Sequence, residues 1–105
     1  MPFFNGASPG WKNKGGTGDR SCPCGSWKVH WLIYSDAEAW PTQCANKACD
    51  KPPTLGGHVY NGGSLLSREE YIVPLCDSCN KLTSTFTIRA GTYCASANKS
   101  ETCEQ

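Results

Sequence analysis

The chain has 105 residues, 38% of them hydrophobic, which is enough for one small core and too little for two. With 11 glycines, 7 prolines and 8 cysteines, its composition is typical of a loop-rich domain that needs covalent or metal cross-links. Ten basic residues balance nine acidic ones, so the chain lacks the strong basic excess of many nucleic-acid-binding proteins. No apolar run approaches the roughly 20 residues of a membrane span.

The first 20 residues are rich in glycine and show no apolar periodicity. They are expected to form a flexible arm, residues 1–20, ahead of a single cysteine-rich domain over 21–105. Trp11 and the Phe3-Phe4 pair could anchor this arm to the core.

A short helix is expected over about 26–35. Ser26 is a suitable N-cap, and the residues after it place Trp27, His30, Trp31 and Tyr34 at helical spacing. A strand is the alternative, because Val29, Trp31 and Ile33 also alternate with their neighbours.

The second half of the chain is expected to contain three strands and one further helix. Leu55 to Tyr60 and Tyr71 to Leu75 are typical of a β-hairpin with a long loop, in which Pro74 would end the second strand. Cys76 to Leu82 is typical of a cysteine knuckle entering a helix. Phe86 to Arg89 is expected to be the last strand, followed by a polar tail.

Four cysteines carry the strongest functional signal, a C-x4-C pair separated by 26 residues from a C-x2-C pair. Zinc favours four soft ligands in a tetrahedron, and two cysteine turns can supply them. The pattern therefore predicts a structural zinc ion bound by Cys44, Cys49, Cys76 and Cys79. Disulfides are the alternative, because the cysteine count is even.

The remaining four cysteines suggest a second metal site. Its ligands would come from Cys22, Cys24 and Cys103 together with His30 or Cys94, so the chain would hold one or two zinc ions. A disulfide between the chain ends, or free thiols, would explain the same residues.

Residues 44 to about 83 resemble the treble-clef, ββα-metal domain of the HNH endonuclease family. The resemblance rests on the two cysteine pairs, on Gly57-His58-Val59 in the first hairpin strand, and on Ile72 to Asn80. It implies a small α+β fold, zinc-stabilised, with irregular loops and a flanking helix and strand outside the matching segment.

The same resemblance implies catalytic roles for two residues. His58 would be the general base, and Asn80 a ligand for a separate catalytic magnesium ion. The chain departs from the family pattern at Gly57, where an acidic residue or histidine is usual, and at Tyr71, which aligns near the family's middle asparagine. A structural role for His58, and a helix-start role for Asn80, are the alternatives.

Three functions follow from these observations. The preferred hypothesis is a non-catalytic zinc-binding module that presents a surface to nucleic acid or protein. Such a surface would use lysines and arginines such as Lys12, Lys14, Arg20, Lys28, Lys47, Lys51 and Lys81, with the tryptophans and Tyr60. The alternatives are an HNH-type nuclease and a secreted disulfide-rich protein.

The beginning of the chain lacks the basic region and apolar stretch of a secretory signal. A cytoplasmic location is therefore expected, where cysteines favour metal over disulfides. The protein would instead be secreted if Met1 replaces a removed signal, which the Asn98-Lys99-Ser100 sequon would fit.

Overall fold

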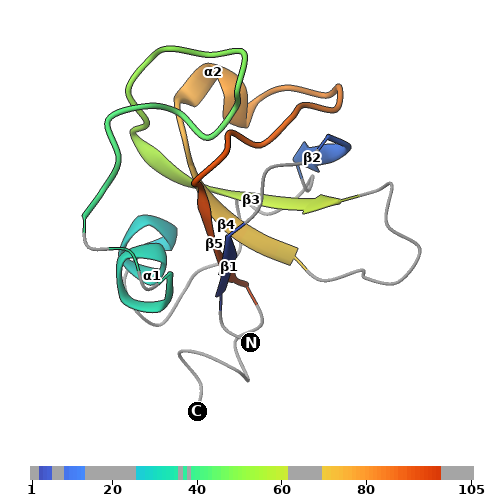
Figure 1. Ribbon diagram of the computed structural model, residues 1–105. Coiled ribbons are helices and arrows are strands. Elements are labelled where there is room, and N and C mark those ends of the chain that lie inside the picture. Colours follow the sequence, from blue (N-terminus) through green and yellow to red (C-terminus); the bar gives the residue numbers. More distant parts are fainter. Residues whose placement is uncertain are drawn as a thin grey trace.

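The computed structural model describes residues 3–5, 9–13, 26–35, 37, 39–61 and 70–97. Within them, one antiparallel sheet has the strand order β1-β5-β4-β3-β2. Figure 1 shows the helix α1 on one side of this sheet, and α2 beside the 41–54 loop at the other end. The strands are β1 (Phe3–Asn5), β2 (Trp11–Asn13), β3 (Leu55–Asn61), β4 (Glu70–Leu75) and β5 (Tyr93–Ser96), and the helices are α1 (Trp27–Tyr34) and α2 (Asp77–Asn80).

The hairpin of β3 and β4 is the centre of the sheet and confirms the sequence prediction. Its register pairs Leu55 with Leu75 and His58 with Ile72. Pro74 does not end the strand, which continues to Leu75. The Pro74 carbonyl faces away from β3 and accepts from the N–H of Ala45 in the 41–54 loop at 2.8 Å. Because the nitrogen and the carbonyl of one strand residue face the same edge, the missing N–H of Pro74 removes no hydrogen bond between β3 and β4.

The helix α1 begins and ends close to the predicted bounds. Ser26 is its N-cap, and the Ser26 hydroxyl accepts a hydrogen bond from the N–H of Val29 at 3.2 Å. The first turn lies directly on β3 at Gly56, where a Cβ atom would stand 2.6 Å from the backbone carbon of Trp27. This close approach explains why β3 carries glycine there.

Each face of the sheet packs against a different apolar cluster, because successive strand residues point to opposite sides. On one face Ile72 and Ala95 pack with Trp31 of α1. On the other face Val59, Val73 and Leu75 pack with the central cysteines and with Ile88. The hairpin thus separates an α1 side from a cysteine side.

Two further parts of the chain contribute to the sheet or pack beside it. The expected arm over 1–20 contributes β1 and β2 at the two edges of the sheet, and Trp11 is 3% exposed; its other residues, apart from Pro9 and Gly10, lie outside the described ranges. Phe86 to Arg89 makes two isolated bridges, Phe86 with Trp11 and Ile88 with Asn46, in place of the expected strand. The last strand is β5, in the segment expected to be a polar tail.

The described residues contain no helix that is both long enough and apolar enough to cross a membrane.

Candidate metal centre

The four central cysteines meet in one cluster, as the spacing predicts. Their Sγ atoms all lie within 4.8 Å of one another, and the Cys49 and Cys76 Sγ atoms are 3.7 Å apart. Zinc–sulfur bonds of about 2.3 Å in a tetrahedron place the sulfurs roughly 3.8 Å apart. The cluster therefore has the dimensions of a four-sulfur metal site.

The first pair is presented by a tight turn in the 41–54 loop. The Asn46 side-chain oxygen accepts from the N–H of Ala48 at 3.0 Å, and the Asn46 carbonyl accepts from the N–H of Cys49 at 2.9 Å. The Cys44 N–H bonds to the Lys51 carbonyl at 2.9 Å, which closes the loop at its base. The wider C-x4-C spacing thus folds into a compact turn over residues 44–49, the knuckle.

The second pair is presented by the start of α2. Cys76 is the N-cap of this helix, and its sulfur takes the place of a capping oxygen by accepting from the N–H of Cys79 at 3.4 Å. Asn13 of β2 holds the same turn from outside, donating to the carbonyls of Cys79 at 2.8 Å and Leu82 at 3.0 Å. The helix has only four residues, so it is shorter than the Cys76–Leu82 segment that was predicted to enter a helix.

Within the described part of the chain, three of the four sulfurs accept hydrogen bonds from nitrogen. The Cys44 sulfur accepts from the N–H of Cys76 at 3.4 Å, the Cys76 sulfur from Cys79, and the Cys79 sulfur from the side-chain amide of Asn46 at 3.5 Å. Such donors stabilise negative charge on a thiolate.

Arg89 binds the back of the knuckle, which the sequence did not suggest. Its Nε donates to the Cys44 carbonyl at 3.1 Å, and its Nη2 to the carbonyls of Cys49 at 2.6 Å and Asn46 at 3.4 Å. One guanidinium thus holds three backbone carbonyls of the turn that carries two of the four clustered cysteines. The only sequence signal for this role was the residue type, because an arginine side chain has enough N–H donors to bind several carbonyls at once.

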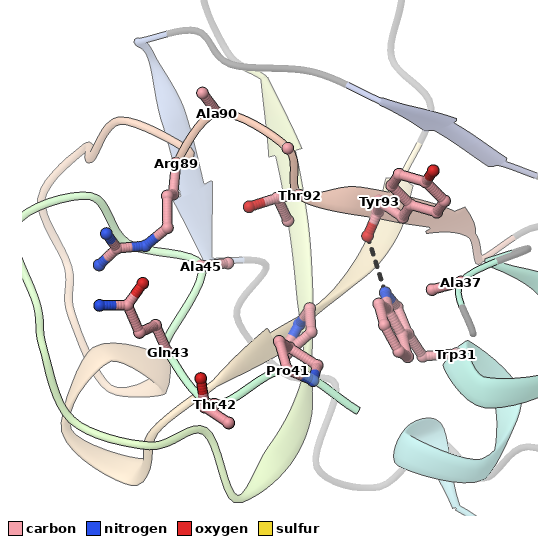
Figure 2. A pocket seen from close by; sticks show the side chains of 12 residues that line it. Trp31, Ala37, Pro41, Thr42, Gln43, Ala45, Arg89, Ala90, Thr92 and Tyr93 are labelled. Carbon is pink, nitrogen blue, oxygen red and sulfur yellow. Dashed lines mark hydrogen bonds between the residues drawn. The ribbon is translucent and has the colours of Figure 1, made fainter. Parts of the chain in front are cut away.

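A cleft of about 450 Å³ lies between this knuckle and α1. Gln43 and Ala45, the neighbours of the candidate ligand Cys44, form one wall with Arg89. Figure 2 shows Trp31 on the opposite side, with its indole N–H bonded to the Tyr93 carbonyl at 2.7 Å. The knuckle therefore shapes a surface hollow as well as the cysteine cluster.

Burial makes the thiolate form of this cluster depend on a cation. Desolvation raises the pKa of Cys44 and of Cys79 above that of an ordinary thiol. Burial also acts to raise the pKa of Cys76, but hydrogen bonds from the Cys79 N–H and from neighbouring thiols outweigh it, and its pKa is lowered. A divalent cation would supply the charge that allows all four sulfurs to be thiolates together.

Zinc fits the donor set best. Among the described residues the site offers four sulfurs and no carboxylate or histidine ligand, which suits zinc and argues against magnesium or calcium. All five cysteines within the described ranges are free of disulfides: Cys44, Cys49, Cys76, Cys79 and Cys94.

The second metal site stays a prediction, since Cys22, Cys24 and Cys103 lie outside the described residues. Its other two candidates point to different faces of the sheet. The His30 Nε2 donates to the Ser96 carbonyl at 2.6 Å, on the α1 side, whereas Cys94 packs in the cysteine-side cluster. Burial raises the pKa of the Cys94 thiol to about 12.

The two residues with implied catalytic roles lie on opposite sides of β3. His58 is 5% exposed on the α1 side, where its ring meets Trp27 edge-on at 5.1 Å and its Nε2 is 2.5 Å from Glu70 Oε1. Asn80 lies on the cysteine side, because its Oδ1 would be 3.0 Å from a Cβ placed on Gly57. The fold does not bring the two side chains to one site.

Gly57 itself has a packing reason to lack a side chain. A Cβ atom there would collide with the Leu75 side chain and press on Asn80. The acidic residue or histidine usual at this position in the HNH family would therefore require the Leu75 side chain to move.

Comparison with protein-family models, curated proteins and solved structures finds no match to this chain.

Proposed function

We propose that this protein is a non-catalytic module built on a structural zinc ion, which Cys44, Cys49, Cys76 and Cys79 bind. The observation that carries the proposal is the convergence of the four Sγ atoms within 4.8 Å. Four protein ligands fill a tetrahedral zinc ion completely and leave no position for a substrate or water. A closed site of this kind contributes folding energy and has no open position for catalysis at the metal.

The order of the elements supports a treble-clef arrangement. A knuckle with the first ligand pair precedes the β3–β4 hairpin, and a helix that begins at the second pair follows it. In such an arrangement the metal joins both ends of the hairpin, so that chelation and folding become one event.

The nuclease alternative has less support. A base and a metal ligand must face the same phosphate, whereas His58 and Asn80 lie on opposite sides of β3. His58 is also buried beneath Trp27, which suits a packing role. Magnesium is therefore left out of the proposal.

Zinc analysis of the purified chain is the decisive experiment. Elemental analysis should give about one zinc per chain, or about two if the outer cysteines bind a second ion. Removal of the metal with an excess of chelator should abolish the dispersed NMR spectrum, because structural zinc contributes on the order of 10–16 kcal/mol in small domains. A metal-free protein that stays folded would refute the proposal.

A groove beside the knuckle is the best candidate for the interaction surface. It has a volume of about 600 Å³, and no acidic residue is among its described lining. The polar lining residues are Asn46, Lys47, Ser84, Thr85 and Thr87, and the apolar ones are Ala48, Leu82 and Phe86. Cationic and hydroxyl donors suit phosphate oxygens, so we propose a nucleic-acid strand as the partner that this surface accepts.

Fluorescence polarisation with labelled single-stranded and double-stranded oligonucleotides tests this surface. Binding should weaken as salt increases, and Lys47→Glu should weaken it at least tenfold, whereas Lys81→Glu, outside the groove, should change it little. Salt-independent binding, or equal effects of the two substitutions, would contradict the assignment of the groove.

A further inference from the structure

Cys49 differs from the other three candidate ligands in its exposure. Cys44, Cys76 and Cys79 are at most 5% exposed, whereas Cys49 is only partly buried. The exposed residues Lys47, Ala48 and Asp50 surround it in the sequence, so the turn that presents Cys49 lies at the surface. A small molecule can therefore approach this sulfur without unfolding the domain.

Cys49 also differs in its hydrogen bonds. Among the described residues, no N–H group donates to its sulfur, although one does so for each of the other three. The bonds that hold Cys49 in place go to its backbone: its N–H donates to Asn46 and its carbonyl accepts from Arg89. A thiolate without donors keeps more of its electron density available for reaction.

We propose that Cys49 is the reactive sulfur of the zinc centre, and that a hydroperoxide oxidises it to form a disulfide with Cys76 and release the metal. This inference rests on the proposed zinc centre. Cys76 is within reach as the partner, because the Cys49 and Cys76 Sγ atoms are 3.7 Å apart. They need to approach by roughly 1.7 Å to reach the S–S bond length of about 2.05 Å.

The chemistry proceeds in two balanced steps. The Cys49 thiolate attacks one oxygen of the hydroperoxide, an S–O bond forms, the O–O bond breaks, and an alkoxide or hydroxide leaves and takes a proton from water. The Cys76 thiolate then attacks the sulfenic sulfur, an S–S bond forms, and hydroxide leaves. Two thiolates lose two electrons in total, which the peroxide accepts.

Loss of the metal follows from the loss of two ligands. Only the Cys44 and Cys79 thiolates would remain, and two sulfurs hold zinc far less tightly than four. The ion would pass to solvent or to a chelator. Because the zinc joins the knuckle to α2, oxidation at one exposed sulfur would loosen the contact between these two elements.

The test uses the zinc-loaded 105-residue chain and hydrogen peroxide. Zinc release is followed with a chromogenic chelator, while samples taken at intervals are denatured, blocked with N-ethylmaleimide and digested. Cleavage after Lys47 separates Cys44 from Cys49, and cleavage before Asp77 separates Cys76 from Cys79. Mass spectrometry can therefore assign every disulfide among the four ligands.

A Cys49–Cys76 cross-link that accumulates in step with zinc release is the expected result. First oxidation at Cys44 or Cys79, or zinc release while Cys49 remains reduced, would overturn the inference and leave the zinc proposal intact. A chain that contains no zinc before oxidation would instead refute the zinc proposal itself.

Two variants sharpen the test. Cys49→His keeps a zinc ligand but removes the reactive sulfur, so peroxide should release its zinc at least tenfold more slowly than in wild type. Cys94→Ala removes a buried thiol outside the centre and should release zinc at the wild-type rate. Equal rates in wild type and Cys49→His would overturn the inference; if Cys49→His holds no zinc, the wild-type peptide map decides.

Discussion

Replacement of Arg89 by glutamine should weaken the zinc centre without touching a ligand. The substitution removes a guanidinium that donates to the carbonyls of Cys44, Cys49 and Asn46. These carbonyls belong to the turn that holds two of the four sulfurs. The knuckle would then keep its shape only through its backbone hydrogen bonds, the Asn46 turn and the metal.

The expected loss follows from the geometry of the three bonds. Those at 2.6 and 3.1 Å are well formed, and the third, at 3.4 Å, is long and contributes little. Hydrogen bonds from a charged donor contribute about 1.5–3 kcal/mol each, but Arg89 is only half-buried and water can replace part of them. We expect a loss of about 2 kcal/mol, which is about 30-fold in zinc affinity when folding and chelation are coupled.

Competition with a chelator of known affinity measures this change, and urea unfolding of the zinc-loaded protein checks it. Arg89→Lys should lose about half as much, since one ammonium reaches fewer carbonyls. Lys47→Gln is the matched control, because it removes a positive charge beside the knuckle from an exposed side chain. If Arg89→Gln bound zinc as tightly as wild type, the Arg89 hydrogen bonds to the knuckle would have no energetic role.

Three further predictions concern the core. Gly56→Ala should lower the free energy of unfolding by about 2–3 kcal/mol in thermal melts, because the new methyl would press on the Trp27 backbone; an unchanged melting temperature would contradict this contact. Cys94→Ala should keep the wild-type zinc content, and a loss of one ion per chain would show that Cys94 is a ligand. Burial lowers the pKa of His30 below 6.5 despite its bond to Ser96. Its stabilising contribution is therefore complete above pH 6.5 and is lost as pH falls through the lower folded-state pKa. His30→Gln should flatten this loss between pH 7 and 5 in urea titrations, and a slope equal to that of wild type would contradict it.

The sequence predicted the parts of the fold that depend on local signals. Ser26 and the aromatic spacing after it located α1, and the β-branched and aromatic runs located the β3–β4 hairpin. The cysteine spacing identified the cluster because zinc imposes a fixed donor number on any chain that binds it. These signals are readable because each concerns residues close together or a metal's known preference.

The rest depends on contacts between distant segments. β1 and β5 pair across most of the chain length, and neither has the alternating apolar pattern of a strand with one buried face. The Gly91 turn with φ 84 redirects the chain into β5, but a single glycine does not reveal which strand will follow. Arg89 was likewise invisible, because its partners are carbonyls, which every residue has.

The strand order has a consequence for how the chain must assemble. β5, which is made last, lies between β1 and β4, and β1, which is made first, pairs only with β5 within the described sheet. The first strand therefore has no place in the sheet until the residues near 95 have left the ribosome. The hairpin and its cysteine pairs can associate earlier, so we expect metal capture to precede closure of the sheet edge.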